Sequence, residues 1–217
     1  DLVHYLLLIV KEHGVAKFIQ IGSSSEHGIT NHPRCESDLC HPSNIYEATK
    51  LAATNLCLGY AARYDLDIVV ARPFTLYGPN DKLRKLIPTL YRSYIEHKTI
   101  NVYPHSGHDF IYINDFIDGI MLLLKADRSL TKGDIVNFGT GVSSSNSQLV
   151  TSLEKALGAS LSINWLKDKY HDYDVENWQA DISKARAKYG WAPKYNLEAG
   201  IKEYVMAEWF GENGDKG

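Results

Sequence analysis

The sequence of 217 residues is 44% hydrophobic and 23% charged, which is ordinary for a globular chain with one sizeable core. Its formal net charge is −3 without a long run of either sign, which argues against nucleic acid or an anionic membrane as the main partner. Three cysteines cannot all pair, so free thiols and a reducing, cytoplasmic location are expected. The most apolar stretch, Leu2 to Val10, is too short to span a bilayer. Because the first residue is Asp and not Met, we expect the native N-terminus to lie upstream.

The first third of the chain alternates helices with short apolar strands. Leu2 to His13 predicts a buried helix that ends at Gly14, and Ala16 to Gly22 predicts a buried strand. After a polar loop, Asn44 to Tyr64 predicts a long helix and Leu66 to Pro73 a second buried strand. Strand, helix and strand in this order form a βαβ unit, so the two strands are expected to be parallel.

Shorter and more varied elements follow. The patterns predict helices over 83–97, 115–126 and 146–157, strands over 100–103, 110–113, 134–138 and 161–165, and two C-terminal helices. Residues 167–178 are very polar and predict a surface loop, and the four tryptophans are expected in the core of the C-terminal part.

The order of these elements predicts the fold class. Residues 1–80 resemble the C-terminal half of a Rossmann-type parallel sheet, because two strands that are apolar on both faces need further neighbours. The α/β sheet is therefore expected to be N-terminally incomplete. Residues 81–217 predict a smaller α+β substrate-binding part, whose strands are free to return to the main sheet.

Tyr46 and Lys50 are the first candidates for chemistry. They stand four residues apart on the predicted long helix and share a face. A neighbouring ammonium lowers the pKa of a phenol from its usual value near ~10, which would make Tyr46 a workable base. The same spacing also occurs in helices without any catalytic role. Its place between two buried strands, with Ser23-Ser24-Ser25 at the carboxyl end of the first, favours the catalytic interpretation because ligands bind at that end of such sheets.

Several motifs in order carry a resemblance to a known family. They are Phe18-Ile-Gln-Ile-Gly-Ser-Ser-Ser, Tyr46-Glu-Ala-Thr-Lys50, Ala71-Arg-Pro-Phe-Thr-Leu-Tyr-Gly-Pro79, His108-Asp-Phe-Ile-Tyr-Ile-Asn-Asp115, Asn137-Phe-Gly-Thr-Gly141 and Asp181-Ile-Ser-Lys-Ala-Arg186. The set resembles the extended short-chain dehydrogenase/reductases, the nucleotide-sugar epimerase/dehydratase family. The resemblance covers almost the whole chain.

This resemblance implies a catalytic group. Tyr46 would be the catalytic base and acid, and Lys50 would hold the nicotinamide ribose of NAD or NADP and lower the pKa of Tyr46. Counted back from Gly28, Ser23 best matches the family's catalytic Ser/Thr, with Ser24 as the alternative.

The resemblance also implies contacts with cofactor and substrate. Pro73 and Phe74 would lie near the nicotinamide, and Thr75, His108 and Ser25 would contact the substrate. Many relatives carry Asn in place of Thr75, and an Arg that grips a phosphate in place of His108, which as a neutral imidazole would grip less well.

Other departures limit these expectations. No Gly-x-x-Gly-x-x-Gly turn follows a first strand, so the chain alone is expected to bind dinucleotide poorly. Gly139-Thr-Gly141 mimics a phosphate loop, but we interpret it as structural. Ser24 and Ser25 stand where dehydratases of the family carry Asp-Glu, so elimination is disfavoured. Glu26 would restore the capacity for elimination only if the loop were shifted by one residue.

The predicted function is NAD(P)-dependent epimerisation or ketosugar reduction of a nucleotide sugar, similar to UDP-glucose 4-epimerase, in a homodimer. The alternative is a non-catalytic remnant or binding module without a dinucleotide site. The histidines and cysteines of the polar loop fit no regular zinc spacing, so no metal is expected; they are His27, His32, Cys35, Cys40 and His41. Arg72 is expected to form a structural ion pair.

Overall fold

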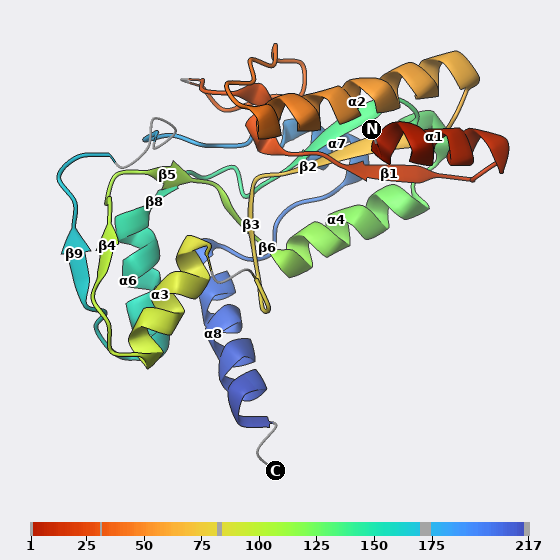
Figure 1. Ribbon diagram of the computed structural model, residues 1–217. Coiled ribbons are helices and arrows are strands. Elements are labelled where there is room, and N and C mark those ends of the chain that lie inside the picture. Colours follow the sequence, from red (N-terminus) through yellow and green to blue (C-terminus); the bar gives the residue numbers. More distant parts are fainter. Residues whose placement is uncertain (1, 31, 82–83, 170–174, 215–217) are drawn as a thin grey trace.

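A parallel three-stranded sheet forms the centre of the fold (Figure 1). The computed structural model describes residues 2–30, 32–81, 84–169 and 175–214. The sheet has the order β1 (Phe18–Ile21), β2 (Ile68–Pro73) and β7 (Asp134–Phe138), and both pairings are parallel. The predicted parallel pair is confirmed. The third strand comes from the C-terminal part, as the sequence allowed.

Helices cover both faces of this sheet (Figure 1). On one face α1 (Leu2–Glu12) and α2 (Ile45–Tyr64) pack over β2, and on the other lie α4 (Ile113–Lys125) and α7 (Ser183–Tyr189). The first interface buries Leu7, Cys57, Ala61, Ile68 and Val70, and the second buries Val69, Ala71, Phe116, Leu123, Val136, Phe138, Ala185 and Trp191. The alternation of side chains along β2 explains why one strand serves two apolar layers.

The long helix α2 has clear signals at both ends. The Asn44 side chain caps it by accepting the backbone N–H of Glu47 at 3.0 Å. It ends at Asp65, which adopts the left-handed conformation with φ 52°. The helix begins directly after the polar loop, so its first turns lie beside the carboxyl end of β1.

A second core lies away from the main sheet. It is enclosed by α3 (Leu86–Ile95), α6 (Asn146–Leu157) and α8 (Leu197–Gly214), with the small pair β4 (Ile100–Val102) and β9 (Ile163–Trp165) (Figure 1). Leu90, Leu149, Leu153 and Ile201 are fully buried in it. The remaining elements are η1 (Ser24–His27), β3 (Thr75–Tyr77), β5 (Gly107–His108), β6 (Phe110–Tyr112), α5 (Arg128–Thr131) and β8 (Ser144–Ser145). β3 pairs with β6 and β5 with β8, which joins the two cores.

One close approach fixes α4 on the sheet. A Cβ atom at Gly119 would lie 2.3 Å from the Phe138 ring of β7, so only glycine fits at this crossing. None of the described helices is both long and apolar enough to cross a membrane.

The structure corrects some details. The expected helix 83–97 begins at Leu86 and ends at Ile95. Trp165 and Trp209 are 43% and 55% exposed and not in the C-terminal core. Trp191 is buried, but it packs against Phe138 of the main sheet. Of the expected surface loop over 167–178, residues 170–174 lie outside the described residues.

Candidate active site

A cavity of about 500 Å³ opens at the carboxyl ends of β1 and β2. Residues from five separate segments line it, and they include most of the residues that the sequence predicted. These are Ser23, Tyr46, Lys50, Pro73, Phe74, Thr75 and His108. The structure thus brings the candidate base, the ammonium and one serine to one place, as expected where parallel strands end.

Tyr46 and Lys50 come from the first two turns of α2. The Tyr46 side chain is 60% exposed and faces the cavity. The Lys50 ammonium donates a hydrogen bond to the Ile21 carbonyl at 2.6 Å, which ties the helix to the end of β1. A lysine ammonium carries three donors, so this bond leaves others for a ligand.

The three consecutive serines have different environments. Ser23 caps η1 and lines the cavity, and its Oγ lies 2.7 Å from that of Ser25. Ser24 is buried, and its Oγ accepts the Trp178 indole N–H at 3.0 Å. Neither Ser24 nor Ser25 is among the lining residues, so the geometry favours Ser23 over Ser24 as the catalytic hydroxyl and gives Ser25 only an indirect place.

The outer part of the cavity combines charged and apolar groups. Lys85 pairs with Asp81 at 2.8 Å and donates to the Leu76 carbonyl at 3.2 Å. His108 lies opposite, with Nε2 at 3.2 Å from the Ser106 hydroxyl. An ammonium, a carboxylate and an imidazole thus gather beside Thr75, and they offer hydrogen-bond donors and acceptors to a polar ligand.

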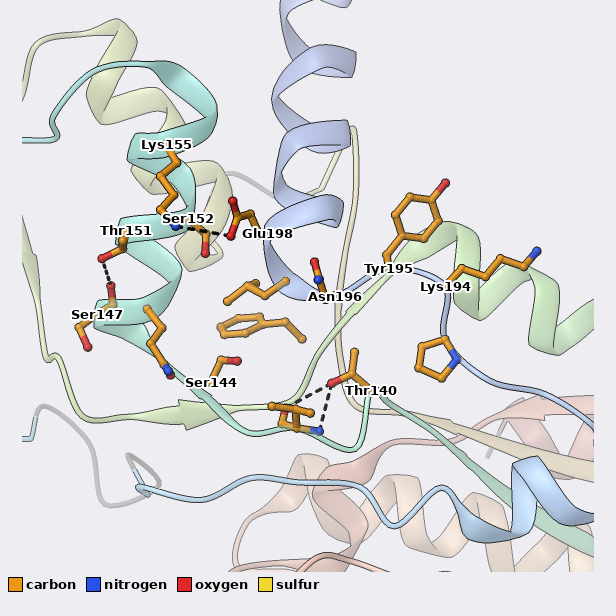
Figure 2. A pocket seen from close by; sticks show the side chains of 15 residues that line it. Thr140, Ser144, Ser147, Thr151, Ser152, Lys155, Lys194, Tyr195, Asn196 and Glu198 are labelled. Atoms are coloured by element: carbon orange, nitrogen blue, oxygen red, sulfur yellow. Dashed lines mark hydrogen bonds and ion pairs between the residues drawn. The ribbon is translucent and has the colours of Figure 1, made fainter.

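A larger cavity of about 700 Å³ lies between α6 and the start of α8 (Figure 2). Figure 2 shows that hydroxyl and amide side chains dominate it, with Lys155 bridging to Glu198 at 3.5 Å. It contains none of the predicted site residues and no paired base and ammonium at a strand end. The larger volume of this cavity is therefore no argument for catalysis, and the smaller cavity is the candidate active site.

The glycine loop after β7 is structural, as the sequence analysis proposed. The buried Asp109 carboxylate accepts the backbone N–H groups of Thr140 at 2.6 Å and Gly141 at 3.0 Å. The Ala180 N–H binds the same carboxylate at 3.0 Å. Because these donors already hold a carboxylate, they are not free to hold a phosphate.

A buried polar cluster lies beneath the site, and only the ion pair of Arg72 in it was predictable from the sequence. Arg72 forms the expected ion pair, and its partner is Glu26 at 2.9 Å, with both side chains almost fully buried. Glu26 therefore points away from the cavity and is not placed to assist elimination. Beside it, burial and the neighbouring Arg72 lower the pKa of His27 to about 4.

The polar loop before α2 is held by local contacts. His32 Nε2 lies 3.2 Å from the Asp38 carboxylate, and the Arg34 guanidinium stacks 3.7 Å over the Trp178 ring. Among the described residues, no three His, Cys, Asp or Glu side chains gather in a way that would hold a metal ion.

The chain is similar to several known proteins of one family. The model of the NAD dependent epimerase/dehydratase family matches residues 1–139. A UDP-glucuronate 4-epimerase of Thermodesulfobacterium geofontis is 32% identical over 212 residues, which are 96% of this chain and 63% of that protein. A dTDP-glucose 4,6-dehydratase of Streptomyces griseus is 28% identical, over 92% of this chain and 61% of that protein.

Solved structures agree with these relatives. The UDP-glucuronic acid 4-epimerase of Bacillus cereus, in complex with UDP-glucuronic acid and NAD, superposes with a TM-score of 0.86 at 29% identity. The match covers 94% of this chain and 65% of that one. The chain thus spans somewhat less than two thirds of the length of the relatives that it matches.

Proposed function

Because the chain belongs to the NAD dependent epimerase/dehydratase family, we propose that its site epimerises a nucleotide-linked sugar with NAD. The observation that carries this proposal is the convergence of Ser23, Tyr46 and Lys50 on one cavity at the carboxyl ends of two parallel strands. Relatives named as epimerases and dehydratases support it, and they do not favour the alternative of a non-catalytic module.

Each side chain has a distinct role in this proposal. The Tyr46 phenolate takes the proton of a sugar hydroxyl, while the Ser23 hydroxyl hydrogen-bonds the same oxygen. The carbon that bears this hydroxyl loses a hydride, for which bound NAD is the acceptor. Tyr46 would later return its proton to the same oxygen, and the hydride that bound NAD would give back to the opposite face of the keto-sugar would leave the carbon inverted. The Lys50 ammonium, one helical turn from Tyr46, holds a ribose hydroxyl with a donor that its bond to the Ile21 carbonyl leaves over.

The residues present fit the nicotinamide half of the cofactor. An ammonium and two hydroxyls face an apolar wall formed by Pro73 and Phe74, a combination that suits a flat ring with an attached ribose. The described residues offer no free glycine turn for the pyrophosphate, since the donors of the loop at Gly141 are occupied by Asp109. We therefore propose contacts to the nicotinamide and ribose only.

Epimerisation is favoured over dehydration by the groups beside Ser23. Elimination needs an acid to protonate the departing hydroxyl, and the two positions after Ser23 carry the hydroxyls of Ser24 and Ser25 in place of carboxylates. The nearest carboxylate in sequence, Glu26, is paired with Arg72 below the site. We expect no loss of water from the sugar.

The relatives suggest the first substrate to test. UDP-glucuronic acid is named for both the Thermodesulfobacterium relative and the Bacillus cereus complex, at the highest identities quoted above. The Lys85 ammonium and the His108 imidazole line the outer part of the cavity, and we expect them to donate hydrogen bonds to its anionic oxygens. The homodimer expected from the sequence stays a prediction.

The proposal is tested by Tyr46→Phe in the complete natural protein, with whatever residues accompany these 217. With NAD and UDP-glucuronic acid, the wild type should form a C4 epimer that NMR resolves. Tyr46→Phe should lower kcat by about 100-fold or more, because only the proton acceptor is lost. Binding of the nucleotide sugar should stay within about twofold, since the ring remains.

Tyr5→Phe is the matched control, because Tyr5 is an exposed tyrosine of α1 outside the cavity. It should leave kcat unchanged. Retention of more than about a tenth of kcat by Tyr46→Phe would remove Tyr46 as the base. A product that has lost water would identify a dehydratase in place of an epimerase.

A further inference from the structure

Glu26 is buried in the centre of three segments that each bring a group to the active site. Its side chain is fully buried, although a lone carboxylate in such a place would be costly. It is not among the residues that line the cavity. Its contacts therefore need an explanation other than ligand binding.

The first contact of Glu26 holds the catalytic serine. Its Oε1 accepts the backbone N–H of Ser23 at 2.7 Å, while the Ser23 hydroxyl caps the short helix η1. This reciprocal arrangement fixes the backbone of Ser23 at the start of η1. The fit is tight on the other side, because a Cβ atom at Gly22 would lie 2.7 Å from the same Oε1.

The second oxygen of Glu26 reaches two other segments. Its Oε2 accepts the Thr54 hydroxyl at 2.8 Å, and Thr54 lies on α2 one turn beyond Lys50. The same oxygen accepts the Nε–H of Arg72 at 3.0 Å, and Nη2 of Arg72 lies 2.9 Å from it. Arg72 immediately precedes Pro73, which lines the cavity.

From these contacts we propose that Glu26 is a positioning residue, which sets the place of Ser23 relative to Tyr46 and Lys50 on α2 and to the end of β2. This inference rests on the proposed function and deepens it. Catalysis by Ser23 and Tyr46 on one sugar hydroxyl requires their oxygens to converge on one atom, and a displacement of about 1 Å can cost up to 100-fold in rate. One carboxylate that bonds all three segments supplies this alignment without touching substrate.

The test must separate positioning from stability. Glu26→Gln alone leaves the Arg72 guanidinium buried without a counter-charge, and it should unfold readily. The double variant Glu26→Met/Arg72→Met replaces the ion pair with apolar side chains of similar length, an exchange that proteins often accept without loss of stability. It should stay folded but melt below the wild type, because the Ser23 N–H and the Thr54 hydroxyl lose their acceptor. It lacks every bond between Glu26 and the three segments.

Two measurements then report on the position of Ser23. Amide exchange of Ser23, followed by NMR, should become at least about tenfold faster in the double variant, because its N–H loses its acceptor. In the complete natural protein kcat should fall by about 10- to 100-fold while KM stays within about twofold. The matched control is Arg92→Met/Glu96→Met, which removes an exposed ion pair of 2.7 Å around the end of α3 and should change neither readout.

Each outcome decides the inference. A double variant that is folded and keeps both Ser23 exchange and kcat within about twofold of the wild type overturns it. Faster exchange with unchanged kcat overturns it as well, since Ser23 would then need no alignment. If the wild type turns over no nucleotide sugar, the proposed function fails by itself. In that case the Ser23 exchange rate alone decides the role of Glu26. Faster exchange in the double variant, but not in the control, supports the role, and unchanged exchange overturns it.

Discussion

His27 carries the clearest pH dependence of a single residue. It is fully buried with Nε2 3.4 Å from Arg72, and burial, Arg72 and Arg34 lower its pKa to about 4, against the smaller opposite effects of Asp38 and Asn137. In the unfolded chain an ordinary histidine pKa of about 6.5 returns. Between these values the unfolded state binds the proton and the folded state does not. The free energy of unfolding should therefore fall as pH drops from about 6.5 to 4, by roughly 3 kcal/mol at the most.

Urea denaturation at several pH values measures this effect. His27→Gln removes the titrating ring and should flatten the acid limb of the stability profile, even if it lowers stability at neutral pH. His13→Gln, at an exposed position just after α1, is the control and should leave the limb unchanged. Equal acid limbs in the wild type and His27→Gln would contradict the assignment.

At the scale of elements, the Asp109 carboxylate joins three segments. It lies between β5 and β6, and it accepts N–H groups from the loop after β7 and from the segment before α7. Asp109→Asn puts an amide NH₂ against a backbone N–H and leaves buried donors unpaired. We expect it to lower the free energy of unfolding by about 3 kcal/mol.

Asp118→Asn on α4 is the control for Asp109→Asn. Its carboxylate pairs with Lys194 at 2.6 Å, but both side chains are largely exposed. Surface pairs contribute about 0–1 kcal/mol, so this variant should change stability little. Similar losses in the two variants would show that Asp109 does not join the segments as described.

The sequence predicts long elements better than short ones. The sequence predicts α2 because its pattern extends over 20 residues, and β1 and β2 because each is a continuous apolar run between turn signals. The strands β5 and β8 have two residues each, and they exist only because distant segments meet, which no local pattern encodes. η1 was also missed, although Ser23-x-x-Glu26 has the spacing of a capping box and was a usable signal.

In the candidate site, too, some residues are predictable from local sequence and others depend on contacts with distant segments. Tyr46, Lys50 and Ser23 lie on or beside long elements, and the structure places them together as predicted. The roles of Ser24 and Glu26 depended on which way each side chain of η1 turns. This direction is set by Trp178 and Arg72, which are far away in sequence.

At the scale of the whole molecule, the described residues hold only one side of a dinucleotide site. We expect a titration of NADH into these 217 residues alone, followed by fluorescence, to show a Kd weaker than about 100 μM. The reason is that contacts to the nicotinamide and ribose must offset the whole cost of binding without a cradle for the pyrophosphate. Saturable binding below about 10 μM would show that a phosphate site exists elsewhere in the chain.

The variant Lys50→Ala is informative in the same titration. Lys50 lines the end of the cavity where we propose that the nicotinamide ribose binds, so any residual binding should weaken further. Lys11→Ala, at an exposed position of α1, should not change it. Equal effects of the two variants would place the bound dinucleotide outside the cavity.

The outer side of β1 has a consequence for handling the protein. In the described part of the chain, β1 pairs only with β2, and its other edge carries no strand. The apolar Ile21 on it is 40% exposed, and nearby α1 exposes Tyr5 and Ile9. An open, apolar strand edge is a template for intermolecular pairing. Concentrated samples of these 217 residues by themselves should therefore aggregate through β1, and a lysine in place of Gln20 would be a simple way to keep them in solution.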